Sequence, residues 1–416
     1  MKSFKQNYYK IVALLGIILS LLWVIFVNTQ PYSDFAYYNT IAKQVANGGQ
    51  WGNTYTSVGY SIILGFVYKL FGSSLITAKL FNLVLTCLSY LIFYKLLIKL
   101  PIKEGRRKIV YTLFVLFPSN IFYNSILGTE IIFTTIFLLA TLIYFSEIKY
   151  KYVLIGILVA VNSMIKPFFL ALFFAIFLVE LLSGIKFLQV IKHTVIILAV
   201  SFLVLSPWVY RNTKLMGQFT FISNNGGIVM YINNNSQNNY GRWMAAANVE
   251  NSIVNTKEYK KANMTAKNKM LSTAAKKWIV SHPGRFIGLG FKRLINTYFV
   301  GDDILYAFDG AGISAYLQYI FIAYASLAKN ILFIPAIVLM IISTVKVILN
   351  LIGRKSIESF TLYSLICFYM FTCVYFVTEG QGRYSFPVIF IAVYFFSELI
   401  FSILSAVKKL KNKVHL

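Results

Sequence analysis

The chain of 416 residues contains only 13 Asp and Glu side chains, and two of them lie where acid–base chemistry could occur. Asp34 follows the first apolar run, and Glu130 opens a later one. A general base must come within about 3 Å of a substrate proton and be shielded enough to be basic. A carboxylate beside an apolar segment meets this requirement better than one in a long loop. Asp34 could instead cap a surface helix, and Glu130 could complement a helix dipole.

Four cations lie near the ends of apolar segments, where they could hold a phosphate. Lys166 interrupts an apolar stretch, Arg211 directly follows one, and Arg383 precedes the last one. Lys79, near the start of another apolar run, is a further candidate. A guanidinium or ammonium group at such a position can bind an anion, or it can anchor the segment at a membrane interface. The sequence leaves both possibilities open for each cation.

The composition identifies the environment in which these residues act. Hydrophobic residues make up 58% of the chain and charged residues 12%, with a mean hydropathy of +0.70. Soluble domains carry about a quarter charged residues, so a soluble or disordered protein is excluded. The 39 Lys and Arg residues give a net charge of +26, which in a soluble protein would suggest nucleic acid. Because most lie in loops between apolar runs, we expect a lipid bilayer and no nucleic acid as partner.

The sequence predicts an all-α polytopic membrane protein with about ten transmembrane helices. A span needs about 20 apolar residues, and runs near this length recur along the chain. The predicted spans are 11–28, 75–98, 109–126, 129–146, 152–166, 168–183, 194–210, 329–350, 359–377 and 384–406. The first has a basic leader but no small-residue cleavage site after it, so we expect a retained anchor.

Basic clusters occur in alternate loops, which sets the expected orientation. They are Lys2/Lys5/Lys10, Lys103/Arg106/Arg107/Lys108, Lys149/Lys151, Lys186/Lys192, Arg354/Lys355 and Lys408/Lys409/Lys411/Lys413. By the positive-inside rule these loops and both termini are cytoplasmic. The chain then divides into an N-terminal transmembrane module, 1–210, an external region, 211–328, and C-terminal transmembrane helices, 329–416.

Two external regions are long enough to have structure of their own. In the first external loop, 29–74, apolar periodicity predicts a surface helix over Asp34–Val45 and a juxtamembrane helix over Ser61–Phe71. In 211–328, the composition predicts a loop over Ser223–Tyr240 and a helical run around Lys257–Ile279. Segment 211–303 has 13 basic and 4 acidic residues, which favours an anionic ligand or lipid surface there.

No cofactor is indicated by the sequence. The three cysteines lie in apolar runs, and the three histidines are too far apart in the predicted topology to share a metal. No phosphate-binding Gly-rich loop or serine-nucleophile motif is present. We therefore expect no dedicated metal site, and leave assistance by a divalent ion open.

Several short motifs between residues 31 and 387 form a recognisable pattern. They are Pro31-Tyr32-Ser33-Asp34 with Val58-Gly59-Tyr60-Ser61, Phe117-Pro118-Ser119 with Leu127-Gly128-Thr129-Glu130, Pro207-Trp208-Val209-Tyr210-Arg211-Asn212 with Asn224-Asn225-Gly226-Gly227, His282-Pro283-Gly284-Arg285-Phe286, and Arg383-Tyr384 with Pro387. This pattern resembles the GT-C glycosyltransferases, and within them the bacterial family-39 type related to protein O-mannosyltransferases and aminoarabinose transferases.

The resemblance implies a GT-C-like fold and an enzyme of the bacterial plasma membrane with its active site on the external face. Such an enzyme transfers a sugar, with inversion, from a polyprenyl (undecaprenyl) phosphate donor to an extracytoplasmic acceptor. Asp34 takes the position of the family's catalytic acidic residue. Residues expected to bind the donor phosphate are Arg211, Lys166, Arg383 and Lys79, and those expected to bind substrate or acceptor are Glu130, Tyr60 and Asn212.

The acceptor and one alternative function remain open at this stage. Protein mannosyltransferases have an acidic pair in this loop, whereas this sequence has Ser33-Asp34-Phe35, and Val58 replaces the proline expected before Gly59. The acceptor could therefore be a cell-envelope glycan, a teichoic polymer or a lipid as well as a protein. A flippase or exporter of lipid-linked sugars would also be basic and bind prenyl phosphates, but it predicts charges along an internal aqueous path.

Overall fold

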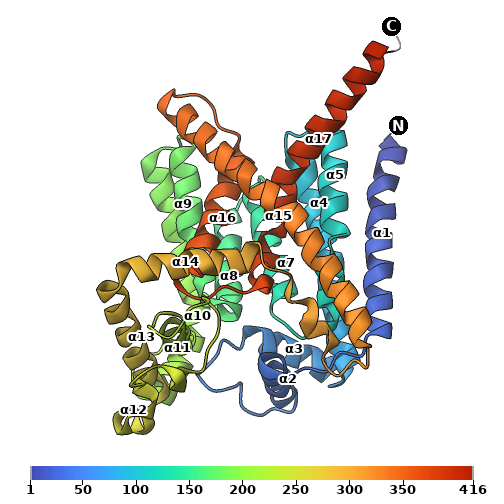
Figure 1. Ribbon diagram of the computed structural model, residues 1–416. Coiled ribbons are helices and arrows are strands. Elements are labelled where there is room, and N and C mark those ends of the chain that lie inside the picture. Colours follow the sequence, from blue (N-terminus) through green and yellow to red (C-terminus); the bar gives the residue numbers. More distant parts are fainter. Residues whose placement is uncertain (1, 415–416) are drawn as a thin grey trace.

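The computed structural model describes the backbone of residues 2–414 and the side chains of residues 7–407, and this part of the chain is helical with no β-strand. Apolar helices form a bundle, and shorter helices gather at one of its ends (Figure 1). Both chain ends lie at the opposite end of the bundle (Figure 1). The chain is thus an all-α membrane protein, as predicted. The basic clusters predicted at residues 2–5 and 408–413 lie outside the described side chains.

Within the described residues, six helices are long and apolar enough to cross a membrane, and each overlaps a predicted span. They are α1 (Lys2–Phe26), α4 (Leu75–Lys99), α10 (Phe187–Met216), α15 (Ala315–Ile352), α16 (Ser359–Val377), and η6 (Gly382–Val388) continuing into α17 (Ile389–Val414). Helices α10 and α15 run unbroken across positions 210 and 328. The region boundaries predicted there fall inside helices.

The other four predicted spans correspond to shorter elements. They are α5 (Glu104–Val115) with α6 (Pro118–Phe122) and η1 (Tyr123–Ser125), then α7 (Glu130–Tyr144), α8 (Lys151–Ile165), and η2 (Pro167–Ala171) with α9 (Leu172–Leu182). Phe117 has extended backbone before Pro118, which ends α5 because a proline restricts the residue before it. Pro167 likewise follows an extended Lys166. The count of ten spans is therefore not confirmed.

Aromatic rings fill the centre of the bundle. The ring of Phe137 on α7 lies 5.5 Å from Phe169 of η2, 5.4 Å from Phe371 of α16 and 5.2 Å from Phe390 of α17 between centroids. These edge-on and tilted contacts join four elements around one fully buried side chain. The short helix α7 is therefore a central element of the bundle.

The predicted helices of the first external loop are confirmed as α2 (Ser33–Ala46) and α3 (Gly59–Phe71). They pack closely because Gly65 has no side chain. A Cβ at Gly65 would lie 2.6 Å from Cβ of Val45 and 2.9 Å from the carbonyl oxygen of Ala42. The N-cap of α2 is Tyr32, and no side chain caps it, so the expected cap at Ser33-Asp34 is wrong.

The region 211–328, predicted to be external, contains more helix than expected. The stretch Ser223–Tyr240, expected to be a loop, includes α11 (Gly226–Asn233), because Tyr231 and Ile232 pack against Leu271 and Ala275 in a small core. The predicted run at 257–279 forms α12 (Lys257–Lys261) and α13 (Met264–Ser281), separated where Asn263 caps α13. The remaining elements are η3 (Ala246–Asn248), η4 (Ile253–Asn255), α14 (Pro283–Tyr298) and η5 (Asp303–Phe308).

Arg293 on α14 joins the region 211–328 to the bundle. Its buried guanidinium donates to the carbonyl oxygens of Phe376, Val377 and Asn233. Burial lowers the pKa of Arg293 to about 10, and the nearby carboxylate of Glu379 opposes this shift. The side chain thus stays charged near neutral pH and collects carbonyl groups from α11 and α16.

We expect Gly65→Ala to destabilise the protein by roughly 1–3 kcal/mol, because the backbone of α2 blocks the new methyl group. Gly288→Ala on α14 is the matched control, since a Cβ there meets nothing within 4 Å. Thermal unfolding in detergent measures both variants. Equal stability of the two would contradict the close packing of α2 on α3.

Candidate functional site

Asp34 lies in the first turn of α2 and faces a cation from the other end of the chain. Its Oδ2 atom is 3.6 Å from Nη2 of Arg383, and its side chain is 61% exposed while that of Arg383 is 13% exposed. The residue before it, Ser33, has φ 49°, a left-handed conformation that non-glycine residues rarely adopt. Such strain often marks a functional position. The carboxylate pairs with Arg383 and does not cap α2.

Arg383 extends from η6 into a group of aromatic rings. Its guanidinium carbon is 5.4 Å from the ring centre of Phe35, and 5.5 Å from those of Tyr306 and Tyr384. Its Nε donates to Oε1 of Gln381 at 2.7 Å. Burial raises the pKa of Tyr306 to about 12, so this ring is neutral beside the guanidinium. The rings restrict the cation to one position and leave several of its N–H groups without a protein acceptor.

A second cation, Lys166, lies beside this group at the junction of α8 and η2. Its Nζ is 3.4 Å from Oε1 of Glu130 and 5.3 Å from the ring centre of Tyr384, the same ring that Arg383 contacts. Glu130 is almost fully buried, and its Oε2 has no hydrogen-bond partner. The structure therefore brings together four predicted residues, Asp34, Arg383, Lys166 and Glu130.

Two glycines allow these side chains to approach one another. A Cβ at Gly128 would lie 2.5 Å from Oε2 of Glu130 and 3.3 Å from the ring of Phe35. A Cβ at Gly59 would lie 2.6 Å from the carbonyl carbon of Met164 and 2.9 Å from the backbone nitrogen of Ile165. Gly59 thus allows α3 to pack against the backbone that leads into Lys166.

A fully buried lysine that the sequence analysis missed holds the segment of Arg383. Nζ of Lys329, on α15, donates to the carbonyl oxygens of Thr297, Gly301 and Gly382 at 2.8, 2.7 and 3.0 Å. All three of its protons are used. In the sequence, Lys329 is a charged residue at the edge of an apolar run. Such a charge often marks a functional or structural position in membrane proteins.

A pair of adjacent carboxylates completes this support. Asp303 accepts the backbone N–H of Arg383 at 2.9 Å and lies 3.5 Å from Nη2 of Arg242. Asp302 accepts hydrogen bonds from Ser119 and, at 3.0 Å, from Tyr123. Burial raises the pKa of Asp302, which nearby Lys329 partly offsets. The sequence placed both aspartates on the external face without indicating their partners.

The other predicted site residues have partners outside this group. Arg211 donates to the carbonyl oxygens of Trp51 and Gly52, and its guanidinium carbon lies 4.5 Å from the ring of Trp208. Asn212 donates to the carbonyl oxygens of residues 221 and 222. Both side chains therefore fasten the end of α10 to neighbouring loops. Their predicted roles toward donor and acceptor stay predictions.

Lys79 and Tyr60 are buried in the bundle. Nζ of Lys79 donates to the carbonyl oxygen of Val27 at 3.3 Å. The ring of Tyr60 lies 5.8 Å from that of Tyr38, and its buried hydroxyl has no hydrogen-bond partner. The free hydroxyl keeps Tyr60 a candidate for substrate binding, whereas Lys79 already has an acceptor.

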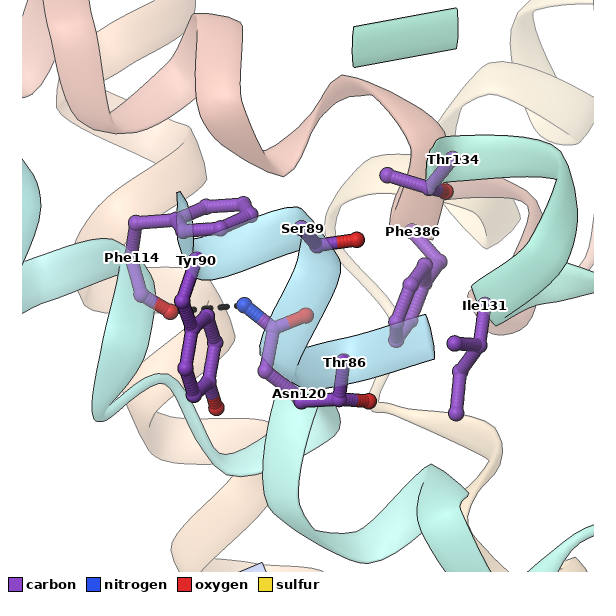
Figure 2. A pocket seen from close by; sticks show the side chains of 8 residues that line it. All are labelled: Thr86, Ser89, Tyr90, Phe114, Asn120, Ile131, Thr134 and Phe386. Carbon is purple, nitrogen blue, oxygen red and sulfur yellow. Dashed lines mark hydrogen bonds between the residues drawn. The ribbon is translucent and has the colours of Figure 1, made fainter. Parts of the chain in front are cut away.

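A small internal cavity lies between α4, α5, α6, α7 and η6. Figure 2 shows the side chains that line it, including Asn120, whose Nδ2 donates to the carbonyl oxygen of Phe114 at 2.6 Å. Its volume of about 10 Å³ is close to that of one water molecule. The cavity is too small for a sugar, so the candidate site remains the group around Arg383. Among the residues that the structure describes, no three His, Cys, Asp or Glu side chains converge as metal ligands.

No protein-family model and no curated protein matches the sequence. Among solved structures, the fold is similar to an oligosaccharyltransferase of Archaeoglobus fulgidus, tethered with an acceptor peptide, with a TM-score of 0.57 and 14% identity over 100% of this chain. This chain spans 52% of that protein's length. ArnT from Cupriavidus metallidurans, bound to undecaprenyl phosphate, aligns with a TM-score of 0.44 and 11% identity over 92% of this chain and 77% of its own. The similarity to the archaeal oligosaccharyltransferase gives this chain a GT-C-like fold, as predicted, and the family-39 type stays a prediction.

We expect Glu130→Gln to cost roughly 3–5 kcal/mol of stability, because it leaves Lys166 as a buried cation without a counter-charge. The double variant Glu130→Gln with Lys166→Met removes both charges and should recover most of that loss. Glu398→Gln is the control, because this carboxylate is 47% exposed and lies 3.8 Å from Arg106, and it should cost at most about 1 kcal/mol. Thermal unfolding in detergent tests the set. If the stability losses of Glu130→Gln and of Lys166→Met alone simply add in the double variant, the two buried charges are not coupled.

Proposed function

We propose that this GT-C-like membrane protein is an inverting glycosyltransferase that moves a sugar from a polyprenyl-phosphate donor to an acceptor on the external side. The observation that carries the proposal is the placement of an exposed carboxylate, Asp34, directly against a nearly buried guanidinium, Arg383. A transferase needs a base that can reach an acceptor and a cation that can hold a leaving phosphate. The resemblance of the sequence motifs and the GT-C-like fold support the same activity.

In the proposed reaction the acceptor hydroxyl attacks the anomeric carbon of the donor sugar. Asp34 takes the hydroxyl proton, a new glycosidic bond forms, and the bond between the anomeric carbon and the phosphate oxygen breaks with inversion. The polyprenyl phosphate leaves with the bonding electron pair. Arg383 and Lys166 stabilise its growing negative charge, which is worth more in a site partly shielded from water.

The amphipathic helix α14 supports the placement of this site at a membrane surface. Ile287, Phe291 and Ile295 are exposed at successive turns of α14, and the helix runs across the direction of the spans (Figure 1). An exposed apolar face on such a helix is typical of one lying in the membrane interface. A prenyl chain would then remain in the bilayer while its phosphate reaches Arg383. We place this face on the exterior, from the distribution of basic loops.

A flippase remains the alternative of another class, since it would also bind lipid phosphates. The purified protein, supplied with a polyprenyl phosphate bearing a labelled sugar and with cell-envelope extract, distinguishes the two. Label in a new product supports the transferase and identifies the acceptor. Movement of intact donor across a vesicle membrane, without any new product, would show a flippase. The same assay with and without chelator tests the open question of a divalent ion.

We expect Asp34→Asn to lower kcat by roughly 10² to 10⁴-fold while the protein folds and inserts normally, because the amide cannot take a proton. Asp309→Asn is the matched control, since Asp309 is another exposed carboxylate of the external face and lies outside the group around Arg383. Transfer of labelled sugar measures activity, and size-exclusion behaviour in detergent measures folding. Wild-type turnover by Asp34→Asn would refute the proposed mechanism.

We expect Arg383→Gln to lower kcat by at least about 10²-fold, because a neutral amide cannot stabilise the leaving phosphate. Arg383→Lys keeps the charge but loses the planar contacts with three rings, so its activity should be intermediate. Arg211→Gln tests the remaining phosphate prediction in the same transfer assay. A loss in kcat equal to that of Arg383→Gln would place Arg211 at the phosphate, whereas reduced stability with little change in kcat would assign it to the loop at Trp51 and Gly52.

A further inference from the structure

The external region has a groove along one face of α13 that the proposed chemistry does not use. Its volume is about 660 Å³, within the range of ligand-binding clefts. One wall consists of α13 residues at helical spacing, and the other of Gln218 and Ile253. The α13 residues are Ala266, Lys269, Met270, Thr273, Ala274 and Lys277.

Two lysines border this groove, and its floor is mostly apolar. Lys269 and Lys277 are eight residues apart, which separates their Cα atoms by about 12 Å along the helix axis, and both side chains line the groove. Met270 and Ala274 lie between these lysines on α13, and Ile253 belongs to the other wall. None of the residues lining the groove is acidic. A chain lying here would contact apolar surface along its length and an ammonium group at two points.

The charge around the groove is strongly positive. Helices α12 and α13 carry the lysines Lys257, Lys260, Lys261, Lys267, Lys269, Lys276 and Lys277, no arginine, and one acidic residue, Glu258. Lysines act as compact point charges without a fixed planar geometry. They therefore suit a flexible chain whose phosphates take no single position relative to the protein. A row of cations of this kind attracts a polyanion more strongly than a single small anion.

The position of α13 favours a polymer over a lipid surface as the occupant. Helices α12 and α13 project from the bundle at the end away from the chain termini, beyond α14 (Figure 1). At the start of α13, the thioether sulfur of Met264 accepts a hydrogen bond from the hydroxyl of Thr54 at 3.8 Å. Asn224 also donates to Thr54, at 2.9 Å. Thr54 belongs to the loop between α2 and α3, so the start of α13 contacts the loop that follows the helix carrying Asp34.

We propose that this groove binds a phosphodiester-linked polymer and presents it to the site as the acceptor. This inference rests on the proposed transferase function and names the chemical class of its acceptor. The lysines at both ends of the groove contact successive phosphates, and the apolar floor packs against the linking units. Because the groove is separate from the group around Arg383, polymer binding requires neither the donor nor turnover.

The test measures binding of a synthetic poly(glycerol phosphate) chain to the full-length protein in detergent, in the inactive Asp34→Asn background. We expect Lys269→Gln with Lys277→Gln to weaken binding at least about tenfold at 0.15 M salt and to reduce its salt dependence. The matched control, Lys260→Gln with Lys261→Gln, removes the same charge from α12, outside the residues that line the groove, and should change binding by less than about threefold. Equal weakening by both pairs would overturn the groove in favour of a general electrostatic attraction.

Two further probes decide the class of ligand. The first probe is a poly-glutamate peptide of similar charge, and the second is vesicles of anionic lipid. If either binds as well as the phosphate polymer, with the same dependence on Lys269 and Lys277, the assignment is overturned. The two proposals also fail separately. If the wild-type protein binds the polymer but transfers no sugar to it or to cell-envelope extract, the transferase is removed. If transfer is unaffected by loss of these two lysines, the groove is removed as the acceptor site.

Discussion

The candidate site depends on holding two cations close together with little access to water. Arg383 and Lys166 pair with different carboxylates, but both contact the ring of Tyr384. Like charges repel more strongly where the dielectric constant is low. Each therefore has its own carboxylate. The two pairs differ, because Glu130 is buried while Asp34 is 61% exposed. Glu130 thus serves as a permanent counter-charge for Lys166, and Asp34 retains a side that solvent and a second molecule can reach.

The position of Arg383 depends in turn on buried cations that take no part in the proposed reaction. Lys329 binds the carbonyl oxygen of Gly382, and Arg293 binds those of Phe376 and Val377 at the end of α16. The turn from α16 to η6 is therefore held on both sides by charged hydrogen bonds, which are stronger than neutral ones. Since Arg293 also binds the carbonyl oxygen of Asn233 on α11, a displacement of the external region would act directly on this turn.

Periodicity and apolar length predicted the elements well where the local sequence decides the structure, as in α2, α3 and the six long helices. The prediction of a loop at α11 was wrong because Asn and Gly dominate its composition, whereas its helix is stabilised by packing on α13. In the same way, the chemistry of Asp34 and Arg383 was visible from residue type and position. Their pairing, and the carbonyl groups around Lys329, result from contacts between distant segments, which a single sequence does not specify.

Under the proposed function, the unequal exposure of the two ion pairs also orders the substrates in space. An inverting displacement requires the attacking hydroxyl and the leaving phosphate on opposite sides of the anomeric carbon. Asp34, exposed on the aqueous side, suits the hydroxyl, and the nearly buried Arg383 and Lys166 suit the phosphate. A lipid-linked donor arrives from the bilayer and a polymeric acceptor from water. The pairing of Asp34 with Arg383 therefore lies where the two routes meet, and the strained turn at Ser33 keeps that carboxylate at the boundary.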